Sequence, residues 1–144
     1  MLEPGKSIIV RVVCSALIPF MQLFALYVIT HGHYGPGGGF QGGGIFGASI
    51  ILQRLYLGSE VAYRKFPRTL APVFGVIGML IYTLAGLVPM AFGGMFLDYG
   101  HLPFPGMEEA ALRGLGILIV EIGIGFSVCG TMVLLFDSLV GGKQ

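Results

Sequence analysis

Charged side chains are scarce in this chain. Only 10% of its 144 residues are Asp, Glu, Lys or Arg, whereas charged residues make up about 25% of a typical soluble domain. The formal net charge is only +1, and no basic patch alternates with aromatic residues, which argues against a nucleic-acid-binding protein. Hydrophobic residues, in contrast, make up 55% of the sequence. This composition excludes an ordinary water-soluble domain and predicts a protein that lies in a lipid bilayer.

Groups that commonly carry out chemistry are also few. The sequence has two cysteines, Cys14 and Cys129, which lie inside apolar runs without metal or redox spacing, so we interpret them as small apolar side chains. The chain has no Ser–His–Asp or Cys–His arrangement, no carboxylate pair at working distance on one helix and no histidine pair placed to ligate haem. We therefore expect no catalytic residue, no metal site and no cofactor.

Four apolar runs are present instead. Each is long enough to cross a hydrocarbon core of about 30 Å as a helix that rises about 1.5 Å per residue. They predict transmembrane helices over residues 7–30, 38–57, 70–94 and 112–136. The first run is too long for a signal peptide, so we expect it to be retained. Because the runs use most of the chain, residues 1–144 are predicted to form a single domain, an all-α integral membrane protein folded as a four-transmembrane-helix bundle.

The connections between these runs differ in charge. Residues 58–69 carry Arg64, Lys65 and Arg68 against one acid, Glu60, and short loops rich in Lys and Arg stay in the cytoplasm. This loop is therefore predicted to be cytoplasmic, and with four helices both termini lie on the same side. Tyrosines at the predicted helix ends fit an interfacial aromatic belt. The charged residues interpreted as interfacial anchors at helix ends are Arg54, Arg113 and Asp137.

Glycine is abundant, with 25 residues, and it is periodic on two of the predicted helices. Gly39, Gly43 and Gly47 are spaced four apart near the start of the second helix and form a face that another helix can approach closely. A second set recurs every seven residues on the fourth helix: Gly116, Gly123 and Gly130. A bundle this small needs less close-packing surface than that internally. We therefore predict that these faces also contact neighbouring subunits.

The connection between the first two helices is the most unusual stretch. From His31 to Gly44 it reads HGHYGPGGGFQGGG. This stretch contains G-x-G-x-x-G, but no strand precedes it and the Gly-Lys-Ser/Thr ending of a phosphate-binding loop is absent, so we reject nucleotide binding. Consecutive glycines let the backbone turn tightly and approach a neighbour closely. Two interpretations stay open, a tight turn packed against protein and the mouth of an ion path.

Three titratable side chains are candidates for an ion path. His31 and His33 can exchange protons near neutral pH, although a histidine hydrogen-bonded to backbone is the usual alternative. Glu121 is the only acid well inside an apolar run, where a charge facing lipid costs roughly 2.5–3.5 kcal/mol. Glu121 should therefore face protein or water, either as a proton or cation relay or as a carboxyl group that joins two helices. We expect its partner on another subunit.

One segment carries a resemblance to a known family. The residues are Gly32, His33, Pro36, Gly37, Gly38, Gly39, Phe40, Gly42 and Gly43. Their pattern resembles the signature of the MnhB/MrpB family, the B subunits of Mrp-type multisubunit sodium/proton antiporters. Related subunits occur in the membrane arms of energy-converting hydrogenases and sulfur reductases. The resemblance implies a small non-catalytic subunit in the cell membrane of a prokaryote, in a complex whose larger subunits carry the principal proton channels.

The combined prediction is a subunit of a Na⁺/H⁺ antiporter module that packs against other membrane subunits. Glu121 and the segment around His33 are predicted to line or support a path for Na⁺ or H⁺. Three alternatives remain: the same type of subunit in an energy-converting hydrogenase or another redox-driven pump, a purely structural scaffold, and a free-standing small channel. Gln41 and the two histidines at 31 and 33 are closer to the hydrogenase-linked members.

Overall fold

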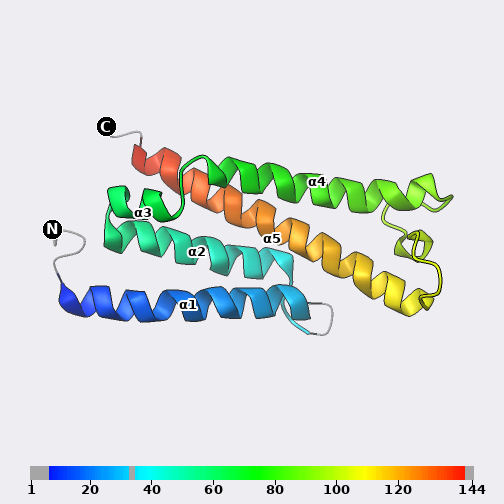
Figure 1. Cartoon of the computed structure of the whole chain (residues 1–144), viewed down its shortest axis with the longest axis horizontal. Coiled ribbons are helices and arrows are strands. Elements are labelled where there is room, and N and C mark those ends of the chain that lie inside the picture. Colours follow the sequence, from blue (N-terminus) through cyan, green and yellow to red (C-terminus); the bar gives the residue numbers. More distant parts are fainter. Residues whose placement is uncertain (1–6, 33–34, 142–144) are drawn as a thin grey trace.

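The fold is a set of four long antiparallel helices. The computed structural model describes residues 7–32 and 35–141. The long helices are α1 (Ile8–His31), α2 (Gly39–Leu57), α4 (Leu70–Ala91) and α5 (Glu109–Gly141). A short helix, α3 (Ser59–Lys65), follows α2, and a 3₁₀ turn, η1 (Tyr99–His101), lies between α4 and α5. α1 begins and α5 ends at the same end of the molecule, beside α3 (Figure 1).

The helix boundaries agree with the apolar runs at most positions. α4 ends earlier than predicted, shortly after Pro89, and Gly93 has a φ of 87°, a conformation that favours glycine. α5 begins earlier than predicted, because Glu109 lies in its first turn and pairs with Arg113 one turn later at 2.5 Å. The loop over 58–69 contains α3, which was not predicted.

Three of the long helices are long and apolar enough to cross a membrane, namely α1, α4 and α5. α2 has 19 residues, and its glycines, Gln41, Gln53 and Arg54 make it less apolar than the other three. The described structure therefore contains three membrane-capable helices. The fourth crossing stays a prediction.

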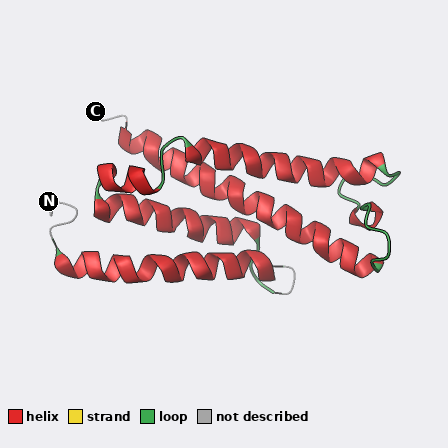
Figure 2. Ribbon diagram, in the orientation of Figure 1, coloured by secondary structure: helices red, strands yellow, loops and turns green. Residues whose placement is uncertain are grey.

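The long helices lie in an open row (Figure 2). α1 packs against α2, α2 against α5, and α5 against α4, whereas α1 and α4 do not pack against each other within the described ranges. α2 and α5 are therefore the central pair. The outer helices expose large apolar side chains, including Phe20 and Phe24 on α1 and Met79 and Leu80 on α4. The predicted bundle thus takes the form of a row, because α5 presents separate faces to α2 and to α4.

The glycine face of α2 lies against α5. A Cβ atom added at Gly43 would lie 2.8 Å from the Gly125 Cα atom, and one at Gly47 would lie 3.4 Å from the Cys129 Cα atom. Gly39 is as close, since its Cβ atom would lie 2.9 Å from the Glu121 carbonyl carbon. These glycines therefore let two helix backbones touch without side chains between them.

The glycines spaced seven apart on α5 lie on the opposite side of that helix. A Cβ atom at Gly123 would lie 3.0 Å from the carbonyl oxygen of Gly78 on α4, and one at Gly130 would lie 2.6 Å from the amide nitrogen of Gly75. Gly116 lies against the side chain of Tyr99. Both glycine faces are thus covered inside the chain. The expectation that they also contact neighbouring subunits is wrong for these positions, because α4, α5 and η1 fill the space.

The contact between α2 and α5 predicts opposite effects for two adjacent glycines. Gly43→Ala would force the α2 and α5 backbones apart, and overpacking of this kind costs about 1–3 kcal/mol. Gly44 is the matched control, since its nearest neighbour to an added Cβ atom is the Met132 sulfur at 3.8 Å. Gly44→Ala should therefore be neutral or stabilise the helix by up to about 1 kcal/mol. Thermal unfolding in detergent micelles measures both, and equal midpoints would contradict the close contact.

Candidate functional site

Glu121 lies where α5 crosses the beginning of α2. A Cβ atom added at Gly38 would lie 3.2 Å from the Glu121 Oε1 atom, and one at Gly32 would collide with the same oxygen. The carboxylate is therefore in contact with backbone from both ends of the glycine-rich connection. Glu121 is partly buried. We expected this acid to face protein or water, and its Oε1 atom lies against protein backbone. Its role as an ion relay or as a link between helices stays a prediction.

The beginning of α2 favours a negative charge. α2 starts at Gly39 with Gly38 as its N-cap. The first N–H groups of a helix have no partner within the helix, and they form the positive end of the helix dipole. A negative charge there is stabilised by about 0.3–1 kcal/mol at the surface and up to about 2 kcal/mol in a partly buried site. This effect offsets part of the cost of an acid in an apolar run.

The glycines of the connection are required by backbone geometry and by close packing. Gly38 has a φ of 126° and a ψ of −173°, a combination restricted essentially to glycine. Its carbonyl oxygen accepts from the Gly42 N–H at 3.0 Å, which starts α2. A Cβ atom at Gly42 would lie 2.7 Å from the Ala25 carbonyl oxygen on α1. The motif is therefore a point where the backbones of α1, α2 and α5 come together.

Three further residues of the motif lie near this point and differ in their exposure. Gly37 lies near α1, since its Cβ atom would be 3.2 Å from the Val28 Cγ1 atom. Pro36 is exposed. Phe40 is 71% exposed, so its ring points away from the helix row and is available to lipid or to another protein.

His31 lies against its own helix and not against Glu121. The His31 imidazole stacks on the Tyr27 ring with centroids 4.2 Å apart, and its Nδ1 atom lies 3.2 Å from the Tyr27 carbonyl oxygen. It is exposed and held against its own helix, as a structural histidine would be. His33, the other candidate, lies outside the described residues.

A second charged cluster joins the other ends of α2 and α5. Arg54 of α2 forms an ion pair with Asp137 of α5, and the two side chains are only 3% and 7% exposed. Arg54 also donates to the Phe66 carbonyl oxygen at 3.3 Å, and the Tyr63 hydroxyl donates to Asp137 Oδ1 at 3.3 Å. The interpretation of Arg54 and Asp137 as interfacial anchors is wrong, because α3 folds over them and removes them from the surface.

Tyr63 attaches α3 to this cluster. Its ring lies between two guanidinium groups, with the Cζ atoms of Arg54 and Arg68 at 4.8 Å and 4.4 Å from the ring centre. Such cation–π contacts contribute about 0.5–2 kcal/mol each, depending on exposure. The signal in the sequence was a pair of opposite charges near the same end of two antiparallel helices. The short helix that covers the pair left no comparable signal.

The opposite end of the row carries exposed ion pairs. His101 Nδ1 lies 2.8 Å from Asp98 Oδ2, and Arg113 pairs with Glu109. Arg113 is 60% exposed, which fits its interpretation as a residue at a helix end. Within residues 7–32 and 35–141, no three His, Cys, Asp or Glu side chains are grouped so that they could hold a metal ion.

Comparisons with known proteins identify the family of the chain. A family model described as a domain related to the MnhB subunit of Na⁺/H⁺ antiporter matches residues 9–134. The chain belongs to this MnhB family. Proteins of Staphylococcus aureus strains Newman, JH1 and COL, provisionally named antiporter subunit mnhB2, are 33% identical to it over 143 residues, with 96% of this chain and 98% of each relative covered. The range matched by the MnhB family model, residues 9–134, spans Glu121 and the glycine-rich connection.

The buried pair in this MnhB-family chain predicts a strong effect of removing one partner. Arg54→Met leaves the Asp137 carboxylate buried without its counter-ion, which costs about 3–5 kcal/mol. The double variant Arg54→Met with Asp137→Leu should recover most of that stability, since two apolar side chains replace the pair. Unfolding in detergent measures the difference. Arg113→Gln is the control, because its exposed pair contributes less than about 1 kcal/mol. If Arg54→Met lowered the free energy of unfolding by no more than this control, the prediction would be wrong.

Proposed function

We propose that this chain is a small, non-catalytic membrane subunit of a multisubunit Na⁺/H⁺ antiporter. Membership of the MnhB family and the names of its Staphylococcus relatives support this function. The exposed apolar faces of α1 and α4 are suited to contact lipid and other membrane subunits of such a complex. Chemistry and the principal ion channels belong to those other subunits.

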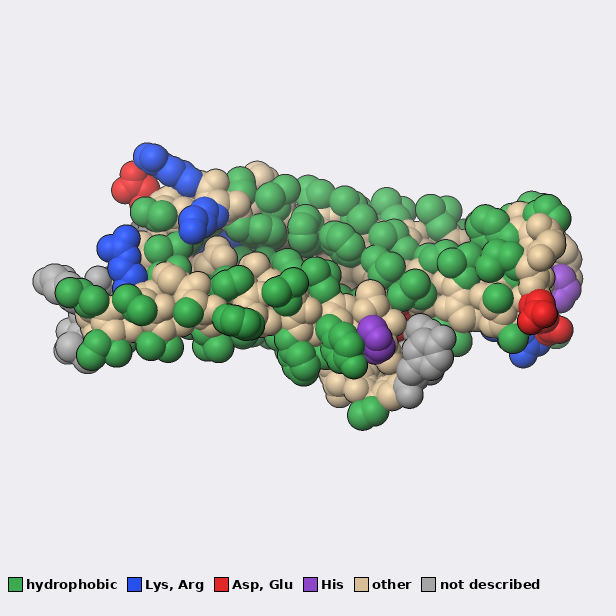
Figure 3. Space-filling model, turned by 60° about the horizontal axis from the view of Figure 1, so that its bottom comes forward, with side chains coloured by type: hydrophobic (Ala, Val, Ile, Leu, Met, Phe, Trp, Pro, Cys, Tyr) green, Lys and Arg blue, Asp and Glu red, His purple; other side chains and the backbone are tan. Residues whose placement is uncertain are grey.

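The proposed topology has four crossings in the cell membrane of a prokaryote. α2 lies between α1 and α5, and four of its glycines, Ser49 and Arg54 are buried, which supports a crossing despite its lower hydropathy. Most basic side chains gather at the end of the row where α3 lies, whereas acidic side chains are present at both ends (Figure 3). Because Lys and Arg favour the cytoplasmic side, the α3 end and both termini are assigned to the cytoplasm.

Within this complex, Glu121 is proposed to line or support the ion path. The observation that carries this proposal is the contact of its Oε1 atom with the backbone of Gly32 and Gly38. An acid inside a membrane helix is typical of proton and ion pathways, and a carboxylate can bind a cation together with the carbonyl oxygens of the glycine backbone beside it. His33 is retained from the sequence as a second candidate, and His31 as a weaker one because it is held against α1.

This role predicts a transport defect for a conservative change. Glu121→Gln keeps the size of the side chain but removes its charge, so Na⁺-dependent proton exchange by the intact complex should fall roughly tenfold or more, which corresponds to about 1.4 kcal/mol. Everted membrane vesicles measure the exchange. Glu109→Gln is the matched control, because Glu109 lies on the same helix but its side chain is 69% exposed, and it should leave exchange unchanged.

The alternatives give different results in the same experiment. Normal transport by Glu121→Gln at a normal complex level would support the purely structural scaffold. Loss of the assembled complex would instead identify Glu121 as a carboxyl group that joins helices. Copurification with nickel-iron or iron–sulfur subunits would assign the chain to a redox-driven pump, and Na⁺ transport by the chain alone in liposomes would make it a free-standing channel.

A further inference from the structure

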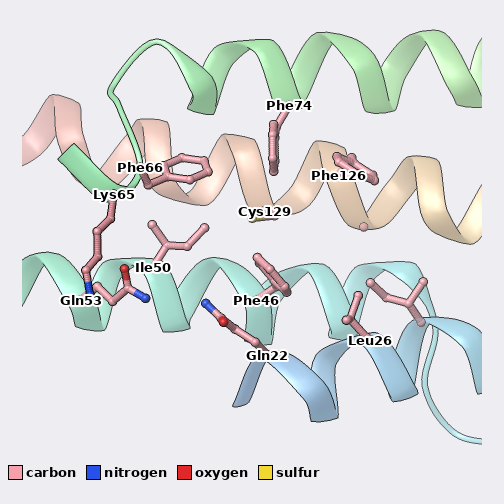
Figure 4. A pocket seen from close by; sticks show the side chains of 12 residues that line it. Gln22, Leu26, Phe46, Ile50, Gln53, Lys65, Phe66, Phe74, Phe126 and Cys129 are labelled. Carbon is pink, nitrogen blue, oxygen red and sulfur yellow. The ribbon is translucent and has the colours of Figure 1, made fainter. Parts of the chain in front are cut away.

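One face of the helix row is hollowed by an apolar groove of about 450 Å³ (Figure 4). Phe46 and Ile50 of α2 and Cys129 of α5 line its centre, while Leu26 of α1 and Phe74 of α4 line its two sides. α1 and α4 do not pack against each other within the described ranges, so no helix of the described chain closes this face. The groove is therefore open to whatever surrounds the protein, which in a membrane is lipid or another subunit.

The lining of the groove follows about two turns of α1 and of α2. Its lining extends along α2 from Phe46 to Gln53 and along α1 from Gln22 to Ile29. At about 1.5 Å of rise per residue, each of these stretches covers about 10 Å of helix axis. Its walls carry four phenylalanine side chains in all: Phe46, Phe66, Phe74 and Phe126. A lining of this length and apolar character can hold part of an extended acyl chain that lies along the membrane normal.

One end of the groove is polar and positive. The Lys65 side chain extends from the end of α3 toward the Gln53 side chain on α2 (Figure 4). Arg64 and Arg68 lie on the same short segment. Its single acid, Glu60, is placed 3.4 Å from Arg64, so it does not neutralise Lys65. An ammonium group and an amide are thus available where the apolar groove reaches the α3 end of the molecule.

We propose that this groove binds an anionic phospholipid. One acyl chain lies along the phenylalanines, and the headgroup phosphate lies beside Lys65 and Gln53. An apolar groove with a positive end matches a molecule that has an apolar chain and a negative headgroup. Anionic headgroups are attracted by basic residues at the membrane surface. The site is independent of whether Glu121 takes part in transport.

A second apolar cavity shows that the positive end is a specific feature. About 320 Å³ in volume, it lies between α4, α5 and the η1 region, and its lining includes Ile81, Leu84, Phe104 and Ile119. None of its lining residues is charged. The groove beside Lys65 differs from this cavity because it combines an apolar wall with a positively charged group.

The test compares lipids with matched acyl chains on the purified intact complex. Native mass spectrometry should detect phosphatidylglycerol bound about tenfold more strongly than phosphatidylethanolamine. Lys65→Glu should reduce this preference about tenfold, so that the two lipids bind about equally. Arg64→Glu is the matched control, because this adjacent side chain is 81% exposed and does not line the groove. It should change the preference clearly less than Lys65→Glu does, because Arg64 adds only to the general attraction of the surface for anionic lipid.

A photocrosslink identifies the occupant without a destabilising substitution of charge. Phe46→p-benzoylphenylalanine places the reactive group in the groove, and illumination of cells should add the mass of a phospholipid to this chain. A crosslink to another polypeptide would show that a subunit helix fills the groove and would overturn the proposal. Equal binding of the two lipids, or an equal effect of Lys65→Glu and Arg64→Glu, would overturn it as well.

Discussion

Direct contact between the backbones of α2 and α5 is the constraint on which the other features depend. Gly43 lies on Gly125, and no side chain separates the two helices there. This approach places Glu121 against the beginning of α2 and, toward the other end of the contact, brings Arg54 to Asp137. A side chain between the helices would disturb both charged sites at once, since they share one interface.

The same interface explains how a weakly apolar helix is accommodated. α2 contains glycines, two glutamines and Arg54, but α1 covers one side of it and α5 the other. Its guanidinium is paired with Asp137 and with the Phe66 carbonyl group, as a buried charge requires. The guanidinium of α2 therefore meets protein, and the apolar surface that faces lipid belongs mainly to α1 and α4.

The open row also gives the protein two kinds of surface. The outer helices present broad apolar faces, suited to lipid and to other subunits, whereas the groove between them has Lys65 at one end. A closed four-helix bundle would have filled this groove with its own side chains. The row exists because Gly123 and Gly130 bring α4 to one side of α5, while Gly125 and Cys129 bring α2 to another.

The sequence by itself determined three membrane-capable helices and the family, because a bilayer fixes the length of an apolar run and the glycine-rich connection is a specific pattern. It also singled out Glu121 as an acid in an apolar run. Only the tertiary structure decided which surfaces meet: the Arg54–Asp137 pair, the cover supplied by α3 and the internal use of both glycine faces. Periodicity defines a face on one helix, but the neighbour that covers that face depends on how all the helices pack.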